Sequence, residues 1–181
     1  MLKVAIIVGV AALLLAGGAA LFIESGVYNI GADDHHTQPV LAIIEQLRER
    51  SIAVRASSIE AYDVSDPQRV AAGGRRYAAL CVGCHLAPGV PKSDIRPGLY
   101  PHPPNLAQGE ELESRRAFWI VKHGIKMSAM PAWGKTLDDM AIWDVVAFLR
   151  KMPGMTPEAY QRMTAAPARA AGIAASPAAG F

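Results

Sequence analysis

The chain has 181 residues, with 18 Lys and Arg against 16 Asp and Glu, and a formal net charge of +2. A charge so close to zero, without a basic run that contains aromatic residues, argues against a nucleic-acid partner. The cysteines are Cys81 and Cys84 alone, and a disulfide across so small a loop would stabilise the fold little. Between an apolar N-terminus and an Ala/Pro-rich C-terminus, enough chain remains for one small domain.

The first element is an apolar segment that follows Lys3 and runs from Val4 to Ile23. A helix of this length spans about 30 Å, which matches the hydrocarbon core of a bilayer. The apolar run continues beyond the small residues at 18–20, which favours an uncleaved signal anchor over a cleaved signal peptide. The cation near the N-terminus places that end in the cytoplasm. We therefore expect residues 1–24 to form a transmembrane helix in a lipid bilayer.

Residues 25–66 connect this anchor to the rest of the chain as a juxtamembrane loop, a helix and a linker. The helix is predicted from Pro39 to Val54. Its apolar stripe consists of Val40, Leu41, Ile44 and Leu47. Such a stripe fits packing on the chain's own domain, contact with the membrane surface or docking of a partner subunit. The sequence leaves these three alternatives open.

The compact domain is expected over residues 67–152, and no strand pattern occurs in it. Its first helix is predicted over 67–80, with an apolar face of Val70, Tyr77 and Leu80. Its last helix is predicted after a capping box formed by Thr136 and Asp139. The buried stripe of that helix is Ile142, Val145, Val146 and Leu149, with Trp143 and Phe148 beside it. These patterns predict an all-α fold.

The motif CVGCH, from Cys81 to His85, carries the chemistry of this domain. A thioredoxin-like CxxC should lie in a strand–helix pattern, but the segment before this motif has a helical period. A zinc site needs four ligands, and no second CxxC or paired histidine follows. The third interpretation is covalent haem attachment, for which C-x-x-C-H is the signature. One haem c would then be bound through Cys81 and Cys84, with His85 as an axial ligand.

In this context the sequence resembles the class I monohaem cytochromes c over residues 67–152. The helix that contains Gly73 and Tyr77 is similar to the family's N-terminal helix, where a glycine permits close crossing of the C-terminal helix. Val145 and Phe148 are placed to make that crossing. Downstream, GIKMSAMPAWG is similar to the family's sixth-ligand loop, in which a methionine precedes a proline, and Met130 is the matching residue.

The resemblance implies that the iron ligands are His85 and Met130. A methionine thioether favours ferrous iron and raises the reduction potential. Met127 is the competing methionine, and its alternative role is that of a gap-filling core or surface residue. His102 and His123 are weaker alternatives, the first as a loop residue and the second as a residue at a helix end before Gly124.

An axial histidine is usually oriented by a hydrogen bond from its other ring nitrogen. In the family a proline carbonyl accepts this bond, and YPHPPNL lies at the corresponding place, so Pro104 is the candidate and Pro103 the alternative. Leu106 would pack on the haem face. Trp133 would contact the haem or a propionate, or would be a core aromatic residue. Candidate partners of the propionates are Arg96, Lys126 and Lys135.

Residues 153–181 are rich in Ala, Pro and Gly. Prolines and glycines interrupt any helix in the last part of this tail, from Pro167 on, which predicts an extended or disordered segment.

Ligation by His85 and Met130 would leave no open iron position, so the resemblance implies a one-electron carrier and not an enzyme. We expect a cytochrome on the periplasmic face of a bacterial inner membrane. It would be a subunit or dedicated partner of a respiratory complex, either a terminal oxidase or a dehydrogenase, or would exchange electrons with another redox protein. The alternative is a haem peroxidase or gas sensor with a labile distal methionine.

Overall fold

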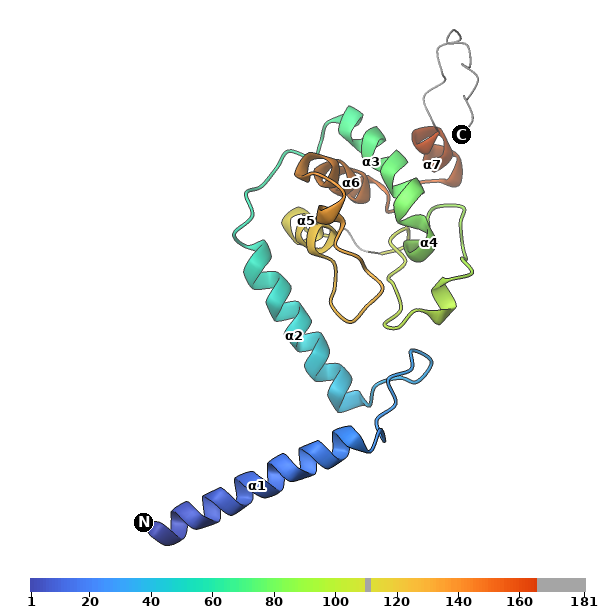
Figure 1. Ribbon diagram of the computed structural model, residues 1–181. Helices are drawn as coiled ribbons and strands as arrows, with labels where there is room; N and C mark the ends of the chain where they lie inside the picture. Colours follow the sequence, from blue (N-terminus) through green and yellow to red (C-terminus); the bar gives the residue numbers. More distant parts are fainter. Residues whose placement is uncertain (110–111, 166–181) are drawn as a thin grey trace, which may run out of the picture. The chain divides into compact units, whose positions relative to one another are not determined.

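The computed structural model describes residues 1–109 and 112–165, and these contain helices and no β-strand (Figure 1). The sequence-based prediction of an all-α chain is therefore confirmed. The helices are α1 (Leu2–Glu24), α2 (Gln38–Ala56), α3 (Pro67–Leu80), α4 (Val82–His85), α5 (Ser114–His123), α6 (Asp139–Lys151) and α7 (Pro157–Thr164). Short 3-10 helices occupy Arg96–Gly98 and Trp133–Lys135.

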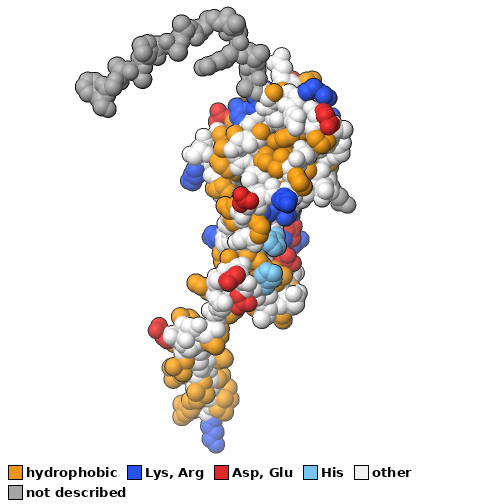
Figure 2. All heavy atoms as spheres, turned by 90° about the vertical axis from the view of Figure 1, so that its right-hand side faces the viewer, with side chains coloured by type: hydrophobic (Ala, Val, Ile, Leu, Met, Phe, Trp, Pro, Cys, Tyr) orange, Lys and Arg blue, Asp and Glu red, His pale blue; other side chains and the backbone are white. Residues whose placement is uncertain are grey.

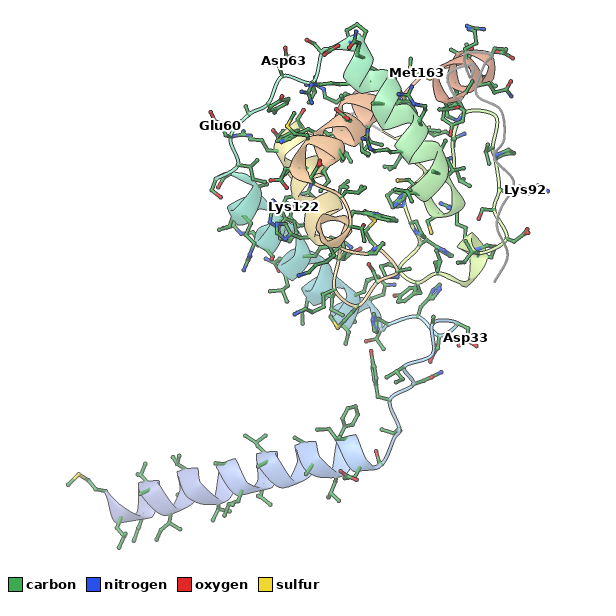
Figure 3. All side chains as sticks on the ribbon, turned by 45° about the horizontal axis from the view of Figure 1, so that its top comes forward. Asp33, Glu60, Asp63, Lys92, Lys122 and Met163 are labelled. Atoms are coloured by element: carbon green, nitrogen blue, oxygen red, sulfur yellow. The ribbon has the colours of Figure 1, made fainter. Side chains whose placement is uncertain are left out.

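The chain divides into two units, Met1–His36 and Thr37–Phe181. The first unit is dominated by α1, which has 23 residues and not one that is buried. Hydrophobic side chains cover α1 along its length in Figure 2 and project from all its sides in Figure 3. By length and composition, α1 is a helix that could cross a membrane, as the sequence predicts.

The centre of the second unit is the crossing of α3 over α6. A Cβ atom on Gly73 would lie 1.8 Å from the carbonyl oxygen of Asp144, so the two backbones touch where this side chain is missing. One turn further on, the rings of Tyr77 and Phe148 pack with their centroids 5.3 Å apart. The crossing that the sequence predicts from Gly73, Val145 and Phe148 is thus present.

The apolar stripe of α6 forms the main core, as predicted. Buried side chains of α6 include Ile142, Trp143, Val145, Val146, Phe148 and Leu149. Each large side chain of this kind contributes about 1.5–3 kcal/mol when it leaves water. Helix α5 adds Phe118, whose ring stacks on Trp143 at 4.2 Å between centroids. These contacts fix α3, α5 and α6 around one interior.

The predicted capping box at the start of α6 is wrong. Asp138 is the N-cap residue, and its carboxylate accepts a hydrogen bond from the backbone N–H of Ala141 at 2.7 Å. The hydroxyl of Thr136 instead bonds to the carbonyl of Trp133, because the short 3-10 helix brings that carbonyl within reach. Threonine and aspartate are both favoured N-cap residues, so only the backbone path before α6 selects Asp138 over Thr136.

Helix α2 packs against α5 within the second unit. Its buried side chains are Ile52 and Ala56, so its contact face lies further toward the C-terminus than the predicted stripe. Leu41 and Ile44 are half-buried, but Leu47 is 68% exposed and does not belong to the packed face. Of the three alternatives left open by the sequence, the structure contains packing on the chain's own domain.

Helix α7 lies within residues 153–181, which the sequence marks as an Ala/Pro-rich tail. It begins because the hydroxyl of Thr156 accepts a hydrogen bond from the N–H of Ala159 and Pro157 occupies the first helical turn. Tyr160 is buried and Met163 packs toward α3 (Figure 3). The predicted extended segment from Pro167 lies outside the described residues.

Candidate functional site

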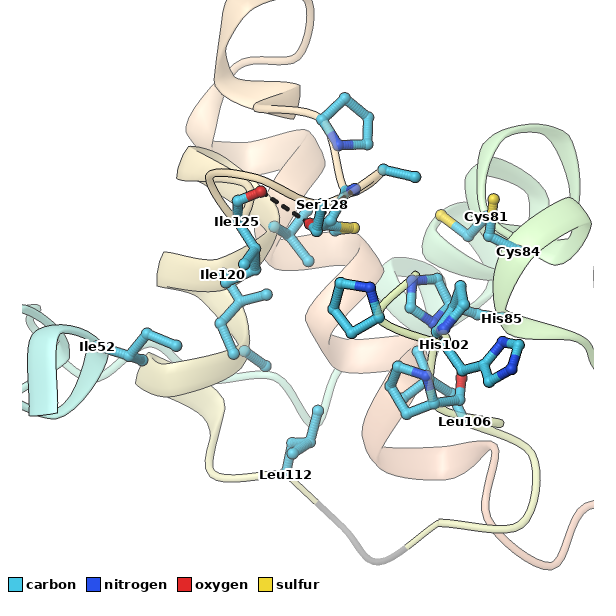
Figure 4. A pocket seen from close by; sticks show the side chains of 18 of the residues that line it. Ile52, Cys81, Cys84, His85, His102, Leu106, Leu112, Ile120, Ile125 and Ser128 are labelled. Carbon is cyan, nitrogen blue, oxygen red and sulfur yellow. Dashed lines mark hydrogen bonds between the residues drawn. The ribbon is translucent and has the colours of Figure 1, made fainter. Parts of the chain in front are cut away.

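The CVGCH motif forms the end of α3 and the single turn of α4. The backbone N–H of His85 donates to the carbonyl of Cys81 at 2.9 Å, which closes this turn. Because three to four residues make one helical turn, Cys81, Cys84 and His85 reach the same pocket (Figure 4). Both thiols are free of disulfides and half-buried.

The pocket has a volume of about 550 Å³, within the range of cofactor sites. Its walls include Tyr77, Cys81, Cys84, His85, Pro104, Leu106, Ala117, Ile120, Val121, Met130, Trp133 and Val145. In Figure 4 the segment with Ile125 and Ser128 lies across the pocket from the two cysteines and His85. The site is therefore a largely apolar cavity with two thiols and an imidazole on one side and a thioether-bearing loop on the other.

Pro104 orients the imidazole of His85. Its carbonyl oxygen accepts a hydrogen bond from Nδ1 of His85 at 3.0 Å, so Nε2 of the neutral ring keeps its lone pair for a metal. The backbone N–H of Leu106 donates to the carbonyl of His85 at 3.2 Å. The carbonyl of Pro103, the alternative that the sequence left open, instead accepts from Nη2 of Arg96 at 2.8 Å.

The environment of His85 favours its neutral form. Burial lowers the pKa of His85, the Pro104 carbonyl opposes this by raising it, and the charge of Arg96 lowers it again, with a net downward shift. Burial also raises the pKa of the Cys81 thiol to about 12, helped by repulsion from Cys84. At neutral pH the pocket thus holds a neutral imidazole and a protonated thiol.

Met130 lines the pocket, whereas Met127 does not: its side chain is 75% exposed. Ser128 fixes the loop between them. Its hydroxyl donates to the carbonyl of Ile125 at 2.7 Å and accepts from the N–H of Met130 at 3.1 Å. The N–H of Ile125 donates in turn to the carbonyl of Met130 at 3.1 Å. The sequence analysis did not identify Ser128. Its position two residues before the candidate ligand Met130 is the one sequence signal that could have found it.

Gly124 holds the other side of this loop. Its φ of +66° lies in the left-handed region, and a Cβ atom there would be 2.6 Å from the carbonyl oxygen of Met130. Glycine is thus required twice, for its backbone conformation and for the close approach of the Met130 segment. As expected from the sequence, α5 ends at His123 immediately before this glycine.

The other predicted site residues differ in whether they line the pocket. His102 lines it but lies on the same side as His85 in Figure 4, and His123 packs on Trp119 at 4.9 Å between ring centroids and is not among the wall residues. Leu106 and Trp133 are half-buried, line the pocket and pack against the core. Met130 is thus the soft donor that the fold presents opposite His85.

Arg96 is distinguished from the other predicted partners of an anionic group. Its Nε atom is buried and has no hydrogen-bond partner among the described residues. Lys126 and Lys135 are exposed, and, like Arg96, they are not among the residues of the pocket wall. A buried donor without an acceptor is costly, and Nη2 of the same side chain donates to the carbonyl of Pro103, which does line the pocket. The two thiols, the imidazole, the thioether and the apolar walls fit a covalently bound haem.

Tyr77 supports the backbone directly after His85. Leu86 has a φ of 61°, a strained value for a residue with a side chain. The buried hydroxyl of Tyr77 donates to the carbonyl of Leu86 at 2.7 Å, and burial raises the pKa of Tyr77 far above its ordinary value. The sequence identified Tyr77 as an apolar face residue and did not indicate this hydrogen bond.

Residues 68–149 match the family model described as cytochrome C oxidase, cbb3-type, subunit III. The matched segment begins in α3, contains the CVGCH motif and the Met130 loop, and ends in α6. No curated protein and no solved structure matches the chain significantly.

Proposed function

From the premise that residues 68–149 are a class I monohaem cytochrome c domain, we propose that the chain is a membrane-anchored electron carrier with one haem c bound through Cys81 and Cys84. A domain of this family carries covalently bound haem and transfers electrons without being itself catalytic. The observation that carries the residue assignment is the convergence of both thiols, the oriented imidazole of His85 and Met130 on one apolar pocket.

In this proposal the haem iron would be held by His85 and Met130. When bound, the haem supplies an iron that exchanges one electron between its ferric and ferrous forms. His85 is held by Pro104 and Leu106, and the Met130 loop is held by Ser128 and Gly124. Because the protein already fixes both donors, little rearrangement of these two side chains would accompany a change in the charge of the iron.

The surroundings of the ligands set the reduction potential. The thioether of Met130 is a soft, neutral donor that favours ferrous iron, and the apolar wall limits access of water. Leu106 and Trp133 contribute to this wall. Arg96, which bonds to the carbonyl of Pro103 beside this wall, is the proposed partner of a propionate, whose negative charge it would offset.

The proposal places the haem domain at the outer face of a bacterial inner membrane. Support comes from α1, which is apolar over its whole length and carries Lys3 near its N-terminal end. The positive-inside tendency orients such a helix with that end in the cytoplasm. An anchor also raises the effective concentration of the domain near membrane partners.

The proposed partner is a respiratory oxidase complex. The matching family model is described as a subunit of a cbb3-type cytochrome oxidase, which supports an oxidase over the other membrane complexes considered, such as a dehydrogenase. This chain would then be a relay that is bound to its complex. The test is to extract the membrane in mild detergent and identify by mass spectrometry which subunits co-migrate with the haem absorbance.

Ligation is tested by comparing Met130→Ala with Met127→Ala. In the unaltered protein and in Met127→Ala, the ferric form should show the long-wavelength band of a methionine-ligated haem, and the ferrous form should bind carbon monoxide slowly. Met130→Ala should lose the band and bind carbon monoxide rapidly. Rapid binding by the unaltered protein would instead support a peroxidase or gas sensor, and absence of covalent haem would contradict the proposal.

A further inference from the structure

A helix outside the matched segment contributes to the wall of the haem pocket. Helix α2 ends before residue 68, where the family match begins. Side chains of α2 nevertheless line the same pocket as Cys81 and Met130: Leu41, Glu45, Arg48, Glu49 and Ile52. Their spacing of three or four residues, with one adjacent pair, places them on a single face of the helix.

This face of α2 packs against the domain. Ile52 is only 2% exposed, and Ala56, one turn later, is also buried. Directly after the helix, Ile59 packs against the main core. Figure 4 shows Ile52 pointing from α2 toward Ile120 of α5, on the opposite side of the view from Cys81, Cys84 and His85. The apolar contacts of α2 thus continue the wall that α5 begins.

A pair of charged groups joins α2 to α5 at the same place. Glu49 accepts a hydrogen bond from Nη2 of Arg116 on α5 and another, at 3.1 Å, from Nε of Arg48. Burial raises the pKa of Glu49, but the hydrogen bonds and charges of Arg48 and Arg116 lower it by more, so the net shift is downward. Glu49 is therefore ionised at neutral pH and holds the two helices together.

The opposite face of α2 is apolar but has no comparable contacts. Ile43 and Leu47 are each 68% exposed and are not among the residues of the pocket wall. Ile52 on the pocket face and Leu47 on the exposed face are both large apolar side chains, and they differ in what they contact. This difference supplies a matched control for any substitution on the pocket face.

We propose that α2 is a structural wall of the haem pocket, closed against α5 by Glu49 and Arg116, and that this wall keeps water away from the cofactor. The inference rests on the proposed binding of haem at Cys81, Cys84 and His85. Water near a haem stabilises the more highly charged ferric form, so solvent access is one of the levers on the reduction potential. The functional haem module would then begin at α2 and not at α3.

The first test uses the full-length, haem-loaded protein in detergent. Ile52→Ala should open the wall, lower the midpoint potential and increase the rate at which added imidazole reaches the iron several-fold. Leu47→Ala, on the exposed face, should leave both quantities unchanged. If Ile52→Ala does not accumulate, Ile52→Val should shift both quantities in the same direction by a smaller amount.

The second test is hydrogen exchange measured by mass spectrometry, which does not depend on redox activity. The haem-loaded protein is compared with a haem-free Cys81→Ser/Cys84→Ser variant. Amides of α2 should exchange at least tenfold more slowly when haem is present, since the wall closes on the cofactor. Equal exchange in both forms, together with identical potentials for Ile52→Ala and Leu47→Ala, would overturn the inference. A preparation without covalent haem c would contradict the proposed function itself.

Discussion

The α3–α6 crossing and the pocket are two halves of one domain that differ in how their interior is filled. At the crossing, Gly73 removes a side chain so that two backbones touch, and Tyr77 packs on Phe148 beside it. At the pocket, apolar side chains surround a cavity of about 550 Å³ that the protein's own side chains leave open. Amino acids alone finish the first half, whereas the second is built for a group that the protein must acquire. In the proposed function, the haem would complete the hydrophobic core on this side.

The largest effect is expected when the packed half is broken by Gly73→Ala. The new Cβ atom would lie 1.8 Å from a backbone carbonyl oxygen that no rotamer change can move. We expect a loss of at least about 4 kcal/mol in the free energy of unfolding, in the range reserved for severe core defects. Urea denaturation and haem content measure this.

Gly98→Ala is the control, since a Cβ atom at Gly98 meets no atom within 4 Å. It should retain normal haem content and an unchanged urea midpoint. A stable, fully loaded Gly73→Ala protein would show that the helices separate without cost, and the contrast between the two halves would be lost.

The second-largest effect is expected from Gly124→Ala, which disturbs the Met130 loop of the pocket. Its left-handed φ and a Cβ atom 2.6 Å from the Met130 carbonyl are both unfavourable, for a combined cost of about 2–4 kcal/mol. The Met130 loop should move outward, and part of the methionine-ligation band should disappear.

Gly154→Ala isolates the two contributions, because Gly154 also has a positive φ, of +76°, but no atom within 4 Å of an added Cβ. This control should cost about 1 kcal/mol and leave the ligation band intact. An equal loss of the band in both variants would mean that close packing of Gly124 does not position Met130.

Tyr77→Phe tests the link between the two halves, since Tyr77 packs in the crossing and bonds to the segment after His85. Removing the hydroxyl leaves the buried carbonyl of Leu86 without its 2.7 Å donor, at a cost of about 1–3 kcal/mol. Tyr62→Phe, at a partly exposed ring that stacks on Trp143, should have little effect. Equal urea midpoints for the two variants would contradict a role for the hydroxyl.

The smallest effect concerns the charges that flank the crossing. The carboxylate of Asp144 forms ion pairs with Nη1 of Arg69 at 3.1 Å and Nη1 of Arg76 at 2.9 Å. The Asp144 side chain is mostly buried. Asp144→Asn should therefore cost about 1–2 kcal/mol, less than a fully buried pair because both arginines are partly in solvent. Asp139→Asn, which loses an exposed pair with Lys122, should cost under about 1 kcal/mol. A larger loss for Asp139→Asn in urea denaturation would reverse this ranking.

Several parts of the fold and site follow from local pattern. The 3.6-residue period of α6 selects Ile142, Val145 and Val146 as core residues because one face of a helix must avoid water. Other predictions are wrong where the local rules allow two equally good residues. The N-cap falls on Asp138 and not on Thr136, and Leu47 faces solvent although its hydrophobicity equals that of its packed neighbours.

The sequence by itself determined the apolar α1, the crossing glycine Gly73 and the clustering of the CVGCH residues, because each depends on residue type and short spacing. The tertiary structure alone decided that Pro104 and not Pro103 bonds to His85, that Ser128 holds the Met130 loop, and that α2 lines the pocket. These features join residues far apart in the chain or choose among equivalent groups. Periodicity carries no information about such contacts, whereas the packing of α2, α5 and the loops fixes which atoms meet.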